Sequence, residues 1–390
     1  MLNKTIGYDL ERLLKAARNG ERNLLRFLRT LVELESPSDD KAAVDRCVSF
    51  TADAFSRLGG RVRRHAIKDA GDVLEVYFGP QKSARTVKPI LLLGHLDTVW
   101  PLGALSQMPF KIDKDRAWGP GVLDMKAGVA MALSVIELLQ TENLLQRPIV
   151  LLLAGDEEIG SHASRAITEK MASGCDAVYV LEPAQGLEGA YKTSRKGIAT
   201  YKVQVTGVAA HSGVNFEQGH SAIAELARQV GAIEALTDLK RGITLNVGTI
   251  EGGTRSNVVA AEVCAEVDVR IVRAADFSRV DRRLRNLRVG DKRCVLKIDG
   301  GLNRPPMERT PATVALYKRA ATLARAMGLD LQEAATGGGS DGNFTSALGI
   351  PTLDGMGAVG EGAHARNESI VLNELAPRTA LLASMLCGAG

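Results

Sequence analysis

Short runs of consecutive apolar residues alternate with segments of helical periodicity along the first half of the chain. Three runs contain no charged position, at residues 90–93, 149–153 and 177–181. Such runs are typical of strands buried on both faces of a sheet. The periodic segments predict amphipathic helices near residues 8–34, 40–58 and 124–140. This alternation predicts an α/β fold, with a mostly parallel sheet and helices on both of its faces.

The pattern changes near residue 194. Residues 198–205 alternate between apolar and polar positions, which is typical of an antiparallel strand with one exposed face. The following segments predict a helix, two strands, a helix and a strand, at residues 219–236, 244–250, 258–272, 276–287 and 293–298. This β-α-β-β-α-β order is the ferredoxin-like arrangement. Because the α/β pattern returns after residue 303, we expect residues 195–303 to be a domain inserted between the two parts of a larger one, 1–194 and 304–390.

Composition narrows the class of protein. With 390 residues, 45% hydrophobic and 24% charged, the chain is long enough for two domains and typical of a globular protein. A net charge of +4 is too small to favour nucleic acid as a partner. No apolar stretch reaches the length of a membrane span, and the start lacks a signal-peptide core. Five dispersed cysteines indicate reduced thiols and a cytoplasmic location.

The first candidate chemistry lies in residues 88–99. The apolar run ends at Gly94, and His95 then precedes Asp97 by two residues. In open α/β sheets, functional groups gather at the carboxyl ends of the strands. His95 therefore suits a metal ligand whose ring a nearby carboxylate orients. The alternative is a histidine at a strand end whose only role is to form hydrogen bonds within a turn.

Four further segments place metal-binding side chains beside expected strand ends or helix starts: Asp124, Glu157 with Glu158, Glu182, and His364. Histidine and carboxylate ligands suit Zn²⁺, and a bridging carboxylate would make a two-metal site. In a nearly extended chain Glu157 and Glu158 point in different directions. One can then bind metal while the other acts as a general base.

Two neighbouring acids have simpler interpretations. Asp156 directly precedes the glutamate pair, and we expect it to be an exposed loop acid. Asp341 precedes a short helical segment, and we interpret it as a residue that caps this helix.

Seven segments, in their order along the chain, resemble the motifs of the co-catalytic zinc peptidase and deacylase family. They are GHLDTV, GPGVLDMKAG, DEEIGS, LEP, AAHSG, TRSNVV and TGGGSDG, and a late histidine follows them. The family includes glutamate carboxypeptidases of the carboxypeptidase G type and acetylornithine deacetylases. The resemblance covers nearly the whole chain and is closest to the carboxypeptidase G branch. Met125 stands where many relatives have a second aspartate, and the family's cis peptide would then join Asp124 to Met125.

The resemblance implies two Zn²⁺ ions per subunit, with Co²⁺ or Mn²⁺ as substitutes, in the larger domain, which would be catalytic. It assigns one ion to His95, Asp124 and Glu182, and the other to Asp124, Glu158 and His364. Glu157 would be the base that deprotonates a water bridging the metals, and Asp97 would support His95.

The inserted domain would serve as a lid and as the contact of a homodimer. His211, in AAHSG, resembles a histidine that reaches the active site of a partner subunit and stabilises the oxyanion. Asn257 and Arg270 resemble residues that hold the substrate carboxylate, and Gly338 with Gly339 a loop that lines the pocket. The alternative for Arg270 is a salt bridge on the surface of a strand.

The resulting expectation is a zinc-dependent exopeptidase that cleaves an amide bond and releases a C-terminal amino acid, with glutamate favoured. A peptide or an N-acyl amino acid would be the substrate, with no nucleic acid and no membrane as partner. The alternative is a deacylase of N-acyl amino acids of the acetylornithine deacetylase type. A third hypothesis is a metal-stabilised binding protein without turnover, which the intact Glu157 disfavours.

Overall fold

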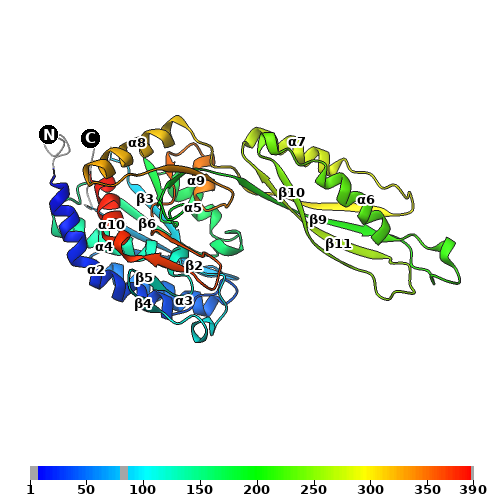
Figure 1. Cartoon of the computed structure of the whole chain (residues 1–390), viewed down its shortest axis with the longest axis horizontal. Coiled ribbons are helices and arrows are strands. Elements are labelled where there is room, and N and C mark those ends of the chain that lie inside the picture. Colours follow the sequence, from blue (N-terminus) through cyan, green and yellow to red (C-terminus); the bar gives the residue numbers. More distant parts are fainter. Residues whose placement is uncertain (1–7, 80–86, 388–390) are drawn as a thin grey trace. The chain divides into compact units, whose positions relative to one another are not determined.

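The computed structural model describes residues 8–79 and 87–387 and divides into two compact units (Figure 1). Unit 1 holds the described residues up to Ser194, together with Arg309–Thr336 and the chain from Ser340 onward. Unit 2 holds Arg195–Glu308 and Gly337–Gly339. The expected boundary after residue 303 falls within the last strand of unit 2, and the glycine-rich segment from 337 to 339 belongs to unit 2 although it lies far along the chain.

A six-stranded sheet forms the centre of unit 1. Its strands, in spatial order, are β1 (Arg61–His65), β2 (Gly71–Phe78), β6 (Ile149–Gly155), β3 (Ile90–His95), β7 (Ala177–Val180) and β14 (Thr352–Leu353). Strands β6, β3, β7 and β14 run parallel to one another, whereas β2 pairs in antiparallel fashion with both β1 and β6. The expected α/β fold with a mostly parallel sheet is thus confirmed.

Alternate residues of the central strands enter two separate hydrophobic cores. Leu92 of β3 belongs to the larger core, whereas its neighbours Leu91 and Leu93 belong to the smaller one. Because successive side chains of a strand point to opposite faces, the sheet is covered on both sides. The helices of unit 1 are α2 (Leu10–Glu33), α3 (Lys41–Arg57), α4 (Ala127–Thr141), α5 (Arg165–Ala172), α8 (Pro311–Ala326), α9 (Gly342–Ala347) and α10 (Leu372–Leu386). Helices α2, α4 and α10 pack together on the larger core (Figure 1).

Helix α2 is one continuous helix of 24 residues. Asp9 caps it by accepting hydrogen bonds from the backbone N–H groups of Glu11 and Arg12. Gly20 lies inside this helix, where a glycine costs about 1 kcal/mol and could divide the segment into two helices. The buried stripe of apolar residues on both sides of Gly20 outweighs that cost.

Two small sheets of unit 1 were not predicted. One joins β15 (Gly360–Glu361), β16 (Ser369–Val371), β5 (Arg116–Trp118) and β4 (Lys111–Asp113), and the other joins β13 (Glu333–Thr336) and β8 (Tyr191–Arg195). The strands of the first sheet have only two or three residues, which are too few to show an alternating pattern. The first of these sheets matters for function because β16 and β5 flank the loops that hold Asp124 and His364.

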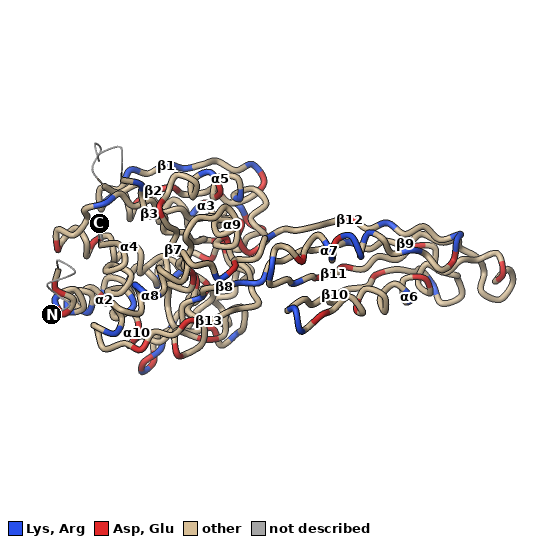
Figure 2. The backbone as a smooth tube through the Cα atoms, turned by 90° about the horizontal axis from the view of Figure 1, so that it is seen from above, with Lys and Arg blue, Asp and Glu red and all other residues tan. Residues whose placement is uncertain are grey.

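Unit 2 has the expected β-α-β-β-α-β order. Its elements are β9 (Gly197–Thr206), α6 (Ala222–Glu234), β10 (Thr244–Gly252), β11 (Glu262–Ile271), α7 (Ala274–Arg285) and β12 (Val295–Arg304). The four strands pair in antiparallel fashion in the order β10-β11-β9-β12. One face of this sheet forms a core with α6 and α7. The basic residues in the last turn of α7, Arg282, Arg283 and Arg285, are exposed, and Figure 2 marks the basic positions along this helix.

No helix among residues 8–79 and 87–387 combines the length and the apolar character that a membrane span requires.

Candidate metal centre and active site

Three neighbouring parallel strands deliver candidate ligands to one edge of the main sheet. His95 is the last residue of β3, Glu158 follows β6 by three residues, and Glu182 follows β7 by two. The carboxyl ends of parallel strands lie at the same edge, so these side chains converge although they are far apart in sequence. Asp124 joins them because Gly128 packs against the end of β7. A Cβ at Gly128 would overlap the carbonyl oxygen of Leu181 there.

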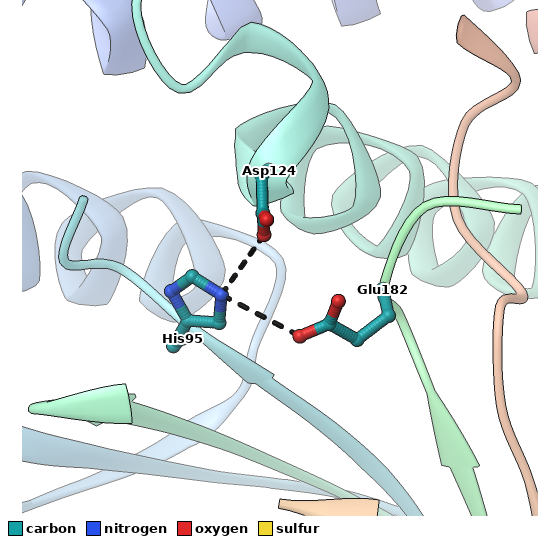
Figure 3. A group of neighbouring side chains, drawn as sticks. All are labelled: His95, Asp124 and Glu182. Carbon is teal, nitrogen blue, oxygen red and sulfur yellow. Dashed lines mark hydrogen bonds and ion pairs between the residues drawn. The ribbon is translucent and has the colours of Figure 1, made fainter. Parts of the chain in front are cut away.

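The first group of ligands consists of His95, Asp124 and Glu182 (Figure 3). His95 Nε2 lies 3.3 Å from Asp124 Oδ1 and 3.6 Å from Glu182 Oε1. The three candidate ligand atoms all lie within 4.8 Å of one another. His95 and Glu182 are buried, so this group is enclosed by the protein.

The second group consists of Asp124, Glu158 and His364. His364 Nε2 lies 3.3 Å from Asp124 Oδ2 and 3.2 Å from Glu158 Oε2. Asp124 therefore presents one carboxylate oxygen to each histidine. His364 is more exposed than the other four residues, with half of its side-chain surface accessible, and its backbone has a φ of 60°. Both groups thus meet at a single carboxylate.

The charges at this centre favour a cation. Hydrogen bonds with Asp124 and Glu158 raise the pKa of His364 to about 10. At His95, burial opposes protonation, but hydrogen bonds with Asp124, Asp97 and Glu182 outweigh it and raise the pKa. Burial, with a contribution from the charge of Asp124, raises the pKa of Glu158. The carboxylates therefore repel one another and hold protons on the imidazoles.

A divalent metal would remove this conflict, because it replaces the protons between the imidazoles and the carboxylates. The donor set of two imidazole nitrogens and three carboxylates suits Zn²⁺. The residues present therefore fit a two-metal site with Asp124 as the shared ligand.

Asp97 connects His95 to the glutamate pair. Its carboxylate accepts hydrogen bonds from the hydroxyl of Ser38 at 2.7 Å and from the backbone N–H groups of Glu157 and Glu158, each at 3.1 Å. His95 Nδ1 lies 3.0 Å from the carbonyl oxygen of Asp97 and 3.4 Å from its carboxylate. Burial opposes ionisation of Asp97, but the hydrogen bonds outweigh it and lower its pKa. One buried carboxylate therefore orients both the ring of His95 and the turn that carries the two glutamates.

The backbone of the glutamate pair differs from the expected extended chain. Residues Glu157–Ile159 form one turn of 3₁₀ helix. With three residues per turn, successive side chains diverge by about 120°. The 3₁₀ turn is thus a different reason to expect that Glu157 and Glu158 point in different directions. Of the two, Glu158 faces His364.

The loop around Asp124 also differs from expectation. Helix α4 begins at Ala127, and Asp124 itself has non-helical backbone angles. The peptide bond between Asp124 and Met125 is cis, as the resemblance implies.

Sequence reasoning missed Glu368, which organises this loop. Its carboxylate accepts hydrogen bonds from the backbone N–H groups of Gly121, Leu123 and Asp124, at 2.9, 2.8 and 3.0 Å. The indole N–H of Trp100 donates to it at 2.7 Å. Glu368 is almost fully buried. In the sequence, Glu368 could have been recognised by its position, four residues after His364 and directly before a strand.

Two interpretations of neighbouring acids were wrong. Asp156 is buried rather than exposed, because its carboxylate accepts hydrogen bonds from the backbone N–H groups of Ala163 and Ser164. Asp341 makes no side-chain capping bond to its helix, and it accepts a hydrogen bond from the hydroxyl of Ser161 instead. Both carboxylates thus support the loop that follows Glu158.

In unit 2 the structure brings together His211 and Asn257. Residues His211 and Val258 form a β-bridge, and the backbone N–H of Ser212 donates to the carbonyl of Asn257 at 3.0 Å. Both side chains are exposed, and His211 Nδ1 accepts a hydrogen bond from the backbone N–H of Gly213. This cluster lies beyond the end of β9.

Arg270 lies with Gly338 and Gly339 at the other end of β9. Its guanidinium forms hydrogen bonds of 2.8 and 2.9 Å with Asp268 and donates to the carbonyl of Gly337. The carbonyls of Gly338 and Gly339 accept hydrogen bonds from Arg195. A strand-surface salt bridge, the alternative for Arg270, is thus present in the structure.

The α/β sheet with paired His and carboxylate groups at its strand ends defines the class, a metal-dependent hydrolase. The chain belongs to the peptidase family M20/M25/M40, whose model matches residues 91–387. The family is metal-dependent, and the chain is a metallo-carboxypeptidase or a related amidohydrolase with exopeptidase chemistry.

Similar proteins cover nearly the whole chain. Carboxypeptidase G2 of Pseudomonas sp. (strain RS-16) is 29% identical over 379 residues, which are 96% of this chain and 91% of that protein. Among solved structures, aminopeptidase PepT of Bacillus cereus has a TM-score of 0.77 at 23% identity, over 94% of this chain and 98% of the other. The M20 family metallo-carboxypeptidase Sso-CP2 of Sulfolobus solfataricus has a TM-score of 0.73 at 18% identity, over 93% and 98%. Both structures share the fold.

Proposed function

We propose that this protein is a glutamate carboxypeptidase-like exopeptidase, which hydrolyses an amide bond and releases a C-terminal glutamate. The observation that carries the proposal is the position of Asp124, whose two carboxylate oxygens each face a different histidine at 3.3 Å. A carboxylate shared in this way is what a co-catalytic pair of metal ions requires. The overall similarity to carboxypeptidase G2 supports this substrate class.

Each ligand group would hold one Zn²⁺. His95 and Glu182 would complete the first site with Asp124, and Glu158 and His364 the second. When bound, such ions lower the pKa of water and polarise the scissile carbonyl. The buried position of the first group fits a role in shaping the centre, and the half-exposed His364 fits a site that faces the substrate.

Glu157 is the general base of the proposed reaction. It would take a proton from the attacking water and deliver it to the leaving amine nitrogen of the released amino acid. The 3₁₀ turn separates its side chain from that of Glu158, and Asp97 fixes the backbone of both residues. Asp97 thereby keeps the base in place while it also orients His95.

The two candidate groups of unit 2 lie at opposite ends of its sheet. Arg270 pairs with Ile198 at the start of β9, whereas His211 and Asn257 lie beyond its end at Thr206. At about 3.3 Å per residue, the strand separates them by roughly 30 Å. One copy of unit 2 therefore cannot bring both ends to a single substrate.

This separation supports a homodimer in which the two groups serve different active sites. We propose that Arg270, with the loop of Gly338 and Gly339, binds the substrate carboxylate in one site. His211 and Asn257 would come from the partner subunit, where His211 would stabilise the developing oxyanion. Arg270 would exchange its hydrogen bonds with Asp268 for those with the substrate carboxylate.

The five cysteines are free thiols, and four of them are buried. This supports the proposed cytoplasmic location, since reduced cysteines are the rule in that compartment.

A substrate panel tests the proposal. The zinc-loaded protein is assayed with peptidyl and N-acyl glutamates, and with N-acetyl derivatives of other amino acids, with and without a chelator. The proposal predicts chelator-sensitive release of glutamate as the fastest reaction. Faster hydrolysis of N-acetylornithine or related substrates would instead identify a deacylase of the acetylornithine deacetylase type. No hydrolysis of any substrate would contradict both and leave a metal-stabilised binding protein.

A further inference from the structure

A small pocket beside the metal centre has no role in the proposed reaction. It lies wholly in unit 1, has a volume of about 260 Å³, and is lined by apolar side chains that include Trp100, Leu102 and Met108. Arg366, which carries a positive charge, also lines the pocket. Because a cavity of about 150 Å³ holds one benzene ring, this pocket has room for a ring with one polar substituent.

Two residues that line the pocket, Trp100 and Arg366, lie close to candidate metal ligands in the structure or along the chain. The Trp100 indole N–H donates to the carboxylate of Glu368, which also binds the backbone N–H of Asp124. Arg366 follows His364 by two residues, a span of at most about 7 Å. The pocket therefore lies next to the loops that carry Asp124 and His364.

Hydrogen bonds to Glu35 hold the rim of the pocket in place. The carboxylate of Glu35 accepts hydrogen bonds of 3.0 Å from the backbone N–H groups of both Gly103 and Leu105. These bonds hold the loop that carries Leu102, whose side chain remains half exposed. A preformed apolar surface next to a catalytic centre lowers the ordering cost of binding.

Arg366 has no ion pair in the part of the chain that the structure describes, and it is exposed. Arg116, by contrast, forms an ion pair with Glu361. An unpaired guanidinium over an apolar pocket suits a carboxylate or another anion that sits at the end of an apolar group.

We propose that this pocket is the subsite for the acyl group of the substrate, and that it selects acyl groups with a flat apolar body and an anionic end. The inference rests on the proposed function, because it places the released glutamate on the opposite side of the scissile bond. Trp100, Leu102 and Met108 contact the apolar body, and Arg366 binds the anionic end.

Binding can be measured without turnover. The chain contains two tryptophans, Trp100 and Trp118, so a Trp118→Phe background leaves Trp100 as the only indole. With Glu157→Gln added to stop hydrolysis, N-(4-carboxybenzoyl)glutamate should quench the fluorescence of Trp100 in a saturable way. Arg366→Gln should weaken this binding by a factor of about two to five, as expected for an exposed ion pair. The matched control Arg325→Gln, an exposed arginine on α8, should leave it unchanged.

Hydrolysis separates this inference from the proposed function. The ratio of kcat/KM for N-(4-carboxybenzoyl)glutamate to that for N-benzoylglutamate should fall by the same factor in Arg366→Gln. Leu102→Ser should instead lower the ratio of kcat/KM for N-benzoylglutamate to kcat/KM for N-acetylglutamate. If all three substrates are hydrolysed and neither variant changes its ratio, the subsite is overturned while the carboxypeptidase activity stands. If none is hydrolysed, the proposed function fails and the subsite fails with it.

Discussion

The backbone N–H of Asp124 donates a hydrogen bond of 3.0 Å to Glu368 Oε1. This bond ties the only ligand shared by both candidate metal groups to a buried carboxylate that has no ligand role of its own. The same carboxylate binds Gly121, Leu123 and Trp100. Glu368 therefore sets the position of the Asp124 carboxylate through the backbone of the loop.

Replacing Glu368 should weaken metal binding although it leaves every candidate ligand intact. In Glu368→Gln, an amide NH₂ group that cannot accept a hydrogen bond replaces one oxygen and faces backbone donors. We expect zinc affinity to fall about 10- to 100-fold, as for other residues that orient ligands. A competition titration against a chromophoric chelator measures this. Glu361→Gln, a change of the same kind at an exposed residue, is the control. Equal zinc affinities of the two variants would show that Glu368 does not position the loop.

Glu157→Gln should lower kcat by a factor of roughly 10² to 10⁴, the range for loss of a general acid–base group. The amide has nearly the shape of the carboxylate but cannot take the proton from water. Initial rates with a peptidyl glutamate at saturating concentration measure the effect. A kcat near that of the wild type would assign the base to another residue.

His211→Ala should lower kcat strongly, since a donor aimed at a developing oxyanion contributes about 2.7–4 kcal/mol. The side chain is exposed in unit 2, so its loss should not change the melting temperature. If His211 only packs within unit 2, stability would fall instead and turnover would not.

Mixing two inactive variants shows which subunit supplies His211. His211→Ala chains are combined with Glu157→Gln chains, and the subunits of the proposed homodimer are allowed to exchange. With supply from the partner, a mixed dimer has one site that lacks both groups and one intact site, so activity returns. Supply within one chain leaves each mixed site without one group, and mixing then restores nothing.

Glu225 should stabilise unit 2 in a way that depends on pH. Burial opposes its ionisation, but hydrogen bonds from the backbone N–H groups of Gly290 and Asp291 and from the side chains of Arg228 and Gln229 outweigh it and lower its pKa from 4.5 to about 2. A carboxyl with a lower pKa in the folded state stabilises that state fully above its unfolded pKa. The contribution is therefore present above about pH 4.5 and is lost as the pH falls towards 2.

Hydrogen exchange of the α6 amides tests this dependence. At pH 7, Glu225→Gln should lower their protection by about 1–3 kcal/mol, and the difference from the wild type should shrink as the pH falls from 4.5. The control Glu234→Gln changes an exposed glutamate on the same helix. A difference that stays constant across this range would mean that ionisation of Glu225 is not the cause.

The sequence was informative where chemistry follows a long buried strand. The apolar runs before His95 and Glu182 predicted strands, and the shared edge of a parallel sheet then brought these residues together. The order of elements in unit 2 could likewise be predicted, because strands of ten residues show a clear alternation of buried and exposed positions.

Other parts depend on contacts that no local pattern encodes. The burial of Asp156 comes from backbone donors in a loop, and that of Asp341 from a serine 180 residues earlier. The role of Glu368 arises from donors about 245 residues away. A carboxylate in a loop has the same appearance in sequence whether it meets water or buried N–H groups, so these three positions needed the structure.

The zinc content of purified variants tests the central claim, which is that two metals share Asp124 while Glu157 remains free to act as the base. The measurement is zinc bound per chain by mass spectrometry of the wild type, Glu157→Gln and Glu158→Gln, after equilibration with the same low concentration of free zinc. The account predicts two zinc ions for the wild type and for Glu157→Gln, and one for Glu158→Gln. Loss of zinc from Glu157→Gln, or two ions retained by Glu158→Gln, would contradict it.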